Sequence, residues 1–219
     1  ENPAYFGIRR APYSVDKGKN DLSFRHIQSG EPLPTSHPMR INPGNIDNAE
    51  VHNAGEIWAQ MLFEGYISLL KRTEGANPPY TFVEARRRMG DYIVAGLKMV
   101  PPDATITETR DAILTAALLL DPTDAQTLAA AFTRRGAGTC AVSPPRYSQD
   151  FVGVVEHDAL QASAHISDVR LLHEPSPCDA DTYFDAGEVA TLEVDIQNTG
   201  LLDLSQAPLT VTASNGAIT

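Results

Sequence analysis

The 219-residue sequence has no apolar run long enough to cross a membrane and no excess of basic residues. A membrane-spanning helix needs about 20 consecutive apolar residues, and no stretch here reaches that length. Lysine and arginine number 17 against 28 acidic residues, which gives a net charge of −11. We therefore expect no membrane span and neither nucleic acid nor an anionic membrane as the main partner.

Cysteine is scarce as well, since the chain contains only Cys140 and Cys178, both in loop-like sequence. Neither has the Cys-x-x-Cys spacing or the histidine partner of a metal site. We predict that the two form one disulfide in an oxidising compartment, with two unpaired thiols as the alternative. No secretory signal peptide is recognisable, and the chain starts with Glu1. We expect this terminus to be a processing site or the cut end of a fragment.

Regular periodicity is missing from residues 1–46, which contain six prolines and many Asn, Gly and Ser residues. We predict an irregular segment there. Apolar residues then recur with helical spacing over residues 49–73. Asp47 or Asn48 is expected to cap this helix, and Glu50 suits its first turn.

Three further helices are predicted, each opening at a recognisable starting signal. These signals are Thr81 with Glu84, Thr105 with Glu108, and Pro122-Thr123. Short capped turns between four helices are typical of a helical lobe, so we predict a mainly α fold over residues 1–138.

The hydrophobic pattern changes after the helices. Residues 139–162 have no clear period and are predicted to form a linker. Short alternating stretches follow, which predict strands. They contain Ile166 to Leu171, Leu192 to Ile196, and Leu209 to Val211. A β-sandwich needs about 100 residues, so we predict a partial β-sandwich-like module over residues 163–219.

The most informative motif runs from Asp47 to Trp58 and reads Asp-Asn-Ala-Glu-Val-His-Asn-Ala-Gly-Glu-Ile-Trp. Its histidine, His52, is expected where the first long helix begins. A nearby carboxylate can hold such a ring in one tautomer, as suits a hydrogen-bond donor to a developing oxyanion. On residue type alone, an exposed histidine and a plain capping aspartate remain the alternative.

This motif resembles the fungalysin family of thermolysin-like zinc peptidases, in which Val-His-x-x-Gly-Glu-x-Trp opens a core helix. The stretch Gly7-Ile-Arg-Arg-Ala-Pro-Tyr-Ser14 is similar to a second segment of that family. The resemblance covers about residues 1–138. It implies a thermolysin-like C-terminal helical lobe whose residues 1–46 face a missing lobe.

The resemblance also implies an activity and roles for single residues. It implies a secreted, extracellular zinc metalloendopeptidase that hydrolyses peptide bonds in proteins. His52 would stabilise the oxyanion and Asp47 would orient its ring. Arg9 or Arg10 would contact the peptide substrate near the scissile bond, because arginine can hold a carbonyl with paired donors. A structural salt bridge is the alternative for either arginine.

The family's metal-binding motif, His-Glu-x-x-His, does not occur in the chain. That motif places two zinc ligands and the general base on one helical face. The resemblance therefore implies a zinc cofactor whose ligands lie outside this chain, on an N-terminal zinc-binding lobe of the same protein. Glu56 is not expected to bind metal, since two further ligands are missing nearby.

We accordingly expect this chain to be inactive by itself and to contribute to catalysis only in the complete enzyme. The alternative function is that of a non-catalytic binding protein. In that case the helical lobe is a degenerate peptidase scaffold, and the β-module binds a surface or a glycan.

Overall fold

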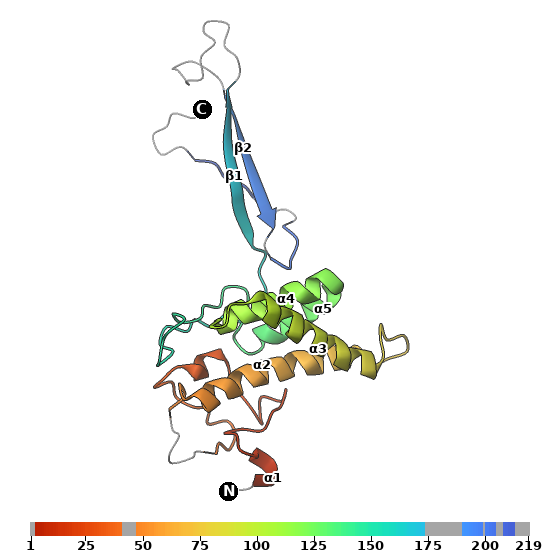
Figure 1. Ribbon diagram of the computed structural model, residues 1–219, viewed down its shortest axis with the longest axis vertical. Helices are drawn as coiled ribbons and strands as arrows, with labels where there is room; N and C mark the ends of the chain where they lie inside the picture. The colour runs from red at the N-terminus through yellow and green to blue at the C-terminus, as the bar shows by residue number, and fades with distance from the viewer. Residues whose placement is uncertain (1–2, 41–46, 174–189, 199, 205–207, 213–219) are drawn as a thin grey trace, which may run out of the picture. The chain divides into compact units, whose positions relative to one another are not determined.

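The computed structural model describes residues 3–40, 47–173, 190–198, 200–204 and 208–212 (Figure 1). Contacts divide the chain into two compact units, residues 1–160 and residues 161–219. The first unit is helical, and the second contains two antiparallel strands. The predicted fold class, mainly α with a small β-module, is confirmed.

The first unit contains four long helices, which are those predicted from the sequence. They are α2 (Val51–Lys71), α3 (Phe82–Met99), α4 (Ile106–Leu120) and α5 (Pro122–Thr133). Two short elements, α1 (Pro3–Phe6) and η1 (Phe24–Ile27), precede them. The two short elements break up a segment that is otherwise irregular over its described residues.

Capping explains where these helices begin. Both predicted capping boxes are present at the starts of α3 and α4. The predicted cap of α2 was wrong, because the N-cap residue is Glu50 rather than Asp47 or Asn48. Glu50 has a non-helical backbone (φ −59°, ψ 137°), and its side chain accepts from two backbone N–H groups of the first turn. A glutamate side chain that folds back can therefore replace the shorter residues preferred at this position.

The four helices form a closed ring of contacts, in which α2 packs on α3 and α5, and α4 packs on the same two helices. Large apolar side chains of this core that are at most 1% exposed include Ile57, Met61, Leu69, Ile113, Leu128 and Phe132, which come from α2, α4 and α5. Each contributes about 1.5–3 kcal/mol by its removal from water. Gly96 allows the close approach of α3 and α4, since a Cβ there would lie 2.7 Å from Cγ1 of Ile113.

A buried carboxylate joins the far end of α2 to α3 and α5. Asp124 is fully buried and forms ion pairs with Arg72, the C-cap of α2, and with Arg88 of α3. The hydroxyl groups of Tyr80 and Tyr92 also donate to Asp124, at 2.9 and 2.6 Å. Four donors on one carboxylate compensate for its loss of water.

Much of the irregular N-terminal segment packs on its own unit. Leu22 and Phe24 are fully buried. Arg135, also buried, donates to the backbone carbonyls of Ser14, Asn20 and Leu22 and pairs with Glu64 of α2 at 2.9 Å. These contacts fix the course of the chain that leads from the arginine pair at Arg9 and Arg10.

Residues 139–160 also contact the helical unit. Val142 and Val155 form an antiparallel bridge within this segment. The hydroxyl of Ser143 accepts from the backbone N–H of Thr107 at the start of α4. The segment thereby lies against the N-terminal end of α4.

Among the described residues of the second unit, β1 (Ala164–His173) pairs antiparallel with β2 (Ala190–Asn198). Ile166 lies opposite Ile196, and Leu171 opposite Leu192, with an irregularity in register after Ile166. The third predicted strand was not found, since the described residues 208–212 are not in a strand. Large apolar side chains of both strands, among them Ile166, Val169, Leu171, Leu192 and Ile196, are exposed.

Candidate active site

His52 lies in the first turn of α2 with its side chain 72% exposed. Its ring atom Nδ1 lies 2.6 Å from Oε1 of Glu50. Because an ionised carboxylate can only accept, Nδ1 carries the proton in this contact. Nε2, the other ring nitrogen, has no hydrogen-bond partner among the described residues. The ring is therefore held on one side and available on the other.

Glu50 uses its second oxygen to cap α2. Oε2 accepts from the backbone N–H of His52 at 2.8 Å and from that of Asn53 at 3.1 Å. Both groups are among the helix N–H groups that have no partner within the helix. One carboxylate thus binds the backbone and the ring of the same histidine.

Asp47, the predicted orienting residue, contributes to the turn that precedes α2. Its Oδ1 accepts from the backbone N–H of Ala49 at 3.1 Å. Its backbone carbonyl accepts from the side-chain amide of Asn53 at 2.7 Å and from the N–H of Glu50 at 3.3 Å. Asp47 therefore shapes the backbone from which Glu50 and His52 project.

The two arginines of the predicted substrate site have different surroundings. Arg10 is 6% exposed, and its Nε lies 2.8 Å from Oε2 of Glu56, which is 1% exposed. Nη1 of Arg10 donates to Oδ1 of Asn48 at 2.7 Å, and Nη2 donates to the carbonyl of Asn53 at 3.0 Å. Arg10 is thus committed to holding the N-terminal segment on α2, and Glu56 is committed to Arg10.

Arg9 lies beside His52. Its Nη1 donates to the backbone carbonyl of His52 at 3.2 Å, and its side chain is only half-buried. A small cavity of about 40 Å³ lies between these residues and is lined by Ile8, Arg9, Arg10, Arg40, His52, Asn53 and Glu56. The structure therefore brings three of the four predicted site residues together at one place, with Asp47 in the adjoining turn.

Sequence reasoning missed the contact of Glu50 with the His52 ring and the anchoring role of Glu56. A usable signal for the first was the position of Glu50, because an N-cap carboxylate lies within reach of the second and third helical residues. No local signal pointed to the second, since Glu56 meets Arg10 only through tertiary packing.

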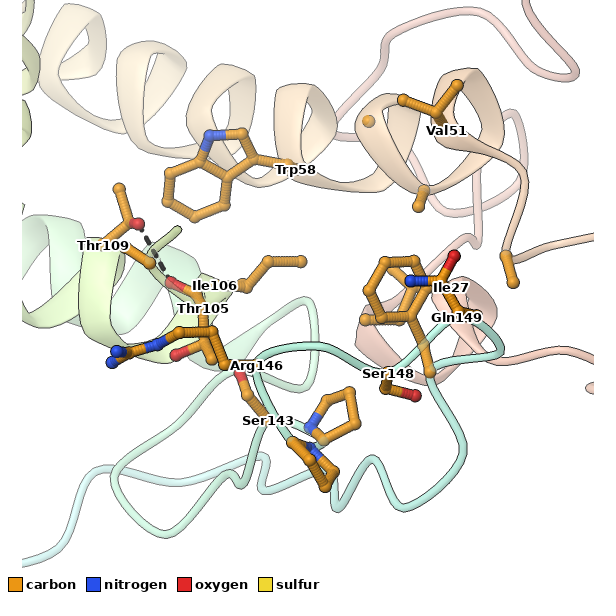
Figure 2. A pocket seen from close by; sticks show the side chains of 17 residues that line it. Ile27, Val51, Trp58, Thr105, Ile106, Thr109, Ser143, Arg146, Ser148 and Gln149 are labelled. Atoms are coloured by element: carbon orange, nitrogen blue, oxygen red, sulfur yellow. Dashed lines mark hydrogen bonds between the residues drawn. The ribbon is translucent and has the colours of Figure 1, made fainter. Parts of the chain in front are cut away.

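A larger pocket of about 470 Å³ opens on the same end of α2. Val51, Ala54 and Trp58 of α2 line it, together with Ile106 of α4 and the loop that carries Arg146. Figure 2 shows Trp58 on one side of this pocket and Arg146 on the other. Trp58 also stacks on Phe132 of α5, with 6.0 Å between ring centroids. The first turns of α2 therefore carry the exposed His52 and also line this larger pocket.

The described residues offer no group of three or more His, Cys, Asp or Glu side chains that would hold a metal ion. Glu50, which contacts His52, and Glu56, which lines the same small cavity, accept from backbone and arginine donors. The donor set therefore does not fit a zinc site in the part of the chain that the structure describes.

Two other predictions concern the whole chain. Within the described ranges, no helix combines the length and apolarity that a membrane crossing requires. Cys178 lies outside the described residues, so the Cys140–Cys178 disulfide stays a prediction.

Comparison with known proteins identifies relatives of the first unit. The family of fungalysin metallopeptidases (M36) matches residues 1–141. The extracellular metalloproteinase mep of Aspergillus terreus is 29% identical over 139 residues, which are 60% of this chain and 19% of that protein. The extracellular metalloproteinase MEP of Neosartorya fischeri is 28% identical over 142 residues, 62% of this chain and 20% of that protein. The match thus spans about a fifth of the length of either relative.

Proposed function

The chain belongs to the fungalysin metallopeptidase family, and on that premise we propose that it is the oxyanion-stabilising part of a secreted zinc metalloendopeptidase. The observation that carries this proposal is the arrangement of His52. Its ring is held at Nδ1 by Glu50, Nε2 has no hydrogen-bond partner among the described residues, and Arg9 donates to the backbone carbonyl of the same residue. The family match and the names of the two fungal relatives support the reaction class.

In the proposed reaction, His52 donates a hydrogen bond from Nε2–H to the oxygen that becomes negative when the peptide carbonyl is attacked. Since Nδ1–H is engaged with Glu50, this donation requires the doubly protonated ring. A donor fixed in place before the reaction stabilises the transition state without reorganisation. The helix start supplies this fixation, because the same carboxylate holds the backbone and the ring.

Asp47 keeps the positioning role that the family resemblance gives it. We assign that role to the turn before α2, where Asp47 accepts from Ala49 and Asn53. Of the two arginines, we propose Arg9 as the substrate contact. Arg10 has its guanidinium engaged by Glu56, Asn48 and Asn53, which leaves it a structural role.

We propose that zinc and its ligands come from an N-terminal lobe of the same protein. When bound there, zinc would polarise the peptide carbonyl and activate water. The exposed side chains around His52 support a docking surface for that lobe, because Ile8 is 85% and Val51 73% exposed. Ile8 lines the cavity beside His52, and Val51 precedes His52 in the chain, so an exposed apolar side chain lies at each of these positions next to the candidate site.

The test is the substitution His52→Ala in the intact enzyme. Loss of one oxyanion donor lowers kcat by roughly 10²–10³-fold. We expect KM for a peptide substrate to change little, because the interaction forms only in the transition state. Steady-state kinetics would measure both constants, and an unchanged kcat would contradict the assignment.

The alternative of a non-catalytic binding protein predicts a different result for the wild-type protein. In that case the intact protein would not cleave a peptide library at any metal concentration. The chain described here, assayed without the proposed lobe, is expected to be inactive under either account, so it serves as the blank in this assay.

A further inference from the structure

Glu50 has two contacts that no simple helix cap requires together. Its Oε2 accepts from the backbone N–H groups of His52 and Asn53, and its Oε1 lies 2.6 Å from Nδ1 of His52. The side chain is 26% exposed, against 72% for His52. The carboxylate is therefore fixed from the helix side and presents one oxygen to an otherwise exposed ring.

Glu50 therefore contacts His52 at two places at once. The backbone and the imidazole of His52 are both bound by the same carboxylate group. Rotation of the His52 side chain about χ1 would break the 2.6 Å contact, which is of the short, charge-assisted kind. Glu50 therefore selects both the direction of the ring and the nitrogen that carries the fixed proton.

Asp47 does not duplicate these contacts. Its Oδ1 accepts from the N–H of Ala49, and its carbonyl accepts from Asn53. Its influence on His52 passes through the backbone of the turn.

We infer that Glu50 is a positioning residue for peptide hydrolysis, which holds His52 with Nδ1 protonated and Nε2 directed to the oxyanion. The inference rests on the proposed function of His52. It adds the group that orients the ring, a role that the family resemblance gives to Asp47.

Glu50→Gln separates the cap from the ring contact. The two backbone N–H groups require the amide oxygen at the cap, so the amide NH₂ faces Nδ1. An NH₂ group can only donate there, and Nδ1 must then accept without a proton. The variant thus keeps the helix start and reverses the protonation of the ring.

The first readout is the ¹⁵N–¹H spectrum of the histidine rings in the full chain, with His52→Ala used to assign the signal. We expect a protonated Nδ1 in the wild type and an unprotonated Nδ1 in Glu50→Gln. Asp47→Asn is the matched control and is expected to leave that signal unchanged. If Asp47→Asn changes the ring signal and Glu50→Gln does not, the inference is overturned.

The second readout is activity of the intact enzyme. Groups that orient a metal-binding histidine typically contribute about 10–100-fold to activity, and we expect the same range for a group that orients His52. We expect Glu50→Gln to lower kcat by that factor with KM nearly unchanged, because its neutral ring would donate from Nε2–H more weakly than the doubly protonated ring of the wild type. Glu50→Asp is a second variant, since aspartate caps well but is too short to reach the ring, and it should lower kcat equally without loss of thermal stability.

The two readouts separate the two claims. Suppose that the ring signal changes in Glu50→Gln but that kcat is normal in both Glu50→Gln and His52→Ala. This result would refute the proposed function, and with it the role of Glu50 in the reaction. A reduced kcat in His52→Ala with normal kcat in Glu50→Gln would refute the role of Glu50 alone.

Discussion

The two ends of helix α2 carry charged contacts of opposite character. At the N-terminal end, Glu50 contacts His52, whose side chain is 72% exposed. At the C-terminal end, Arg72 pairs with Asp124, which is fully buried. The difference is instructive. The exposed contact leaves the second ring nitrogen of His52 available, whereas the buried carboxylate of Asp124 is engaged by four donors that are therefore not available for a reaction. We therefore read the first end as functional and the second as structural.

The largest expected effect is on the buried end. Asp124→Ala removes the common partner of Arg72, Arg88, Tyr80 and Tyr92. Breaking a buried ion pair by removal of one partner typically costs about 3–5 kcal/mol in the free energy of unfolding. Chemical denaturation of the chain would measure this loss.

The control for that loss is an exposed pair on the same unit. Asp91→Asn breaks the contact of Asp91 with Arg87, in which the two side chains are 58% and 81% exposed. An exposed pair contributes at most about 1 kcal/mol. Equal losses in Asp91→Asn and Asp124→Ala would remove the distinction between buried and exposed contacts.

The arginine pair offers the same comparison at neighbouring positions. Arg10→Ala leaves Glu56 buried without its partner and should lower the free energy of unfolding by about 3 kcal/mol. Arg9→Ala should leave stability unchanged. In the intact enzyme it should lower kcat/KM by about 10-fold or more, the value of a hydrogen bond to a charged donor.

Thermal unfolding and steady-state kinetics of both variants would check this. A stability loss in Arg9→Ala with normal kcat/KM would reverse the roles of the two arginines.

The smallest expected effect is a pH dependence of the free energy of unfolding, which arises at the buried C-terminal end of α2. Burial, followed by the hydrogen bond to Asp124, raises the pKa of Tyr92 from the ordinary 10.0 to about 12. The folded protein therefore keeps this proton at pH values where the unfolded chain loses it. Its contribution to stability is complete below pH 10 and is lost as the pH rises towards 12, by at most about 1.4 kcal/mol per pH unit.

Tyr92→Phe should flatten this slope in denaturation experiments between pH 10 and 12. Some slope will remain, because burial also raises the pKa of Tyr80, which donates to the same carboxylate. An identical slope in wild type and variant would show that Tyr92 does not titrate as the buried contact requires.

The sequence predicted the parts of the fold that local interactions decide. The capping boxes at Thr81 and Thr105 lie within single turns, and both are present. The cap of α2 was missed, because Glu50 is a less common cap than Asp47 or Asn48 and adopts this role by folding its longer side chain back.

The candidate site depends more on tertiary contacts. The pattern selected Arg9 and Arg10 together, and only the packing of Arg10 on Glu56, 46 residues away in sequence, distinguishes them. The grouping of Asp124 with Arg72 and Tyr80 likewise joins residues that no local pattern relates. The β-module was predicted from alternation alone, and two of its three predicted strands are present.

The central claim is that His52 binds the oxyanion, and the most direct measurement is the affinity of a tetrahedral analogue. A peptide with a phosphonamide at the scissile position would be tested against the intact wild-type enzyme and His52→Ala. The account predicts that the variant binds this analogue roughly 10²–10³-fold more weakly while KM for the matching peptide stays nearly constant. Equal weakening of both, or an unchanged affinity for the analogue, would contradict it.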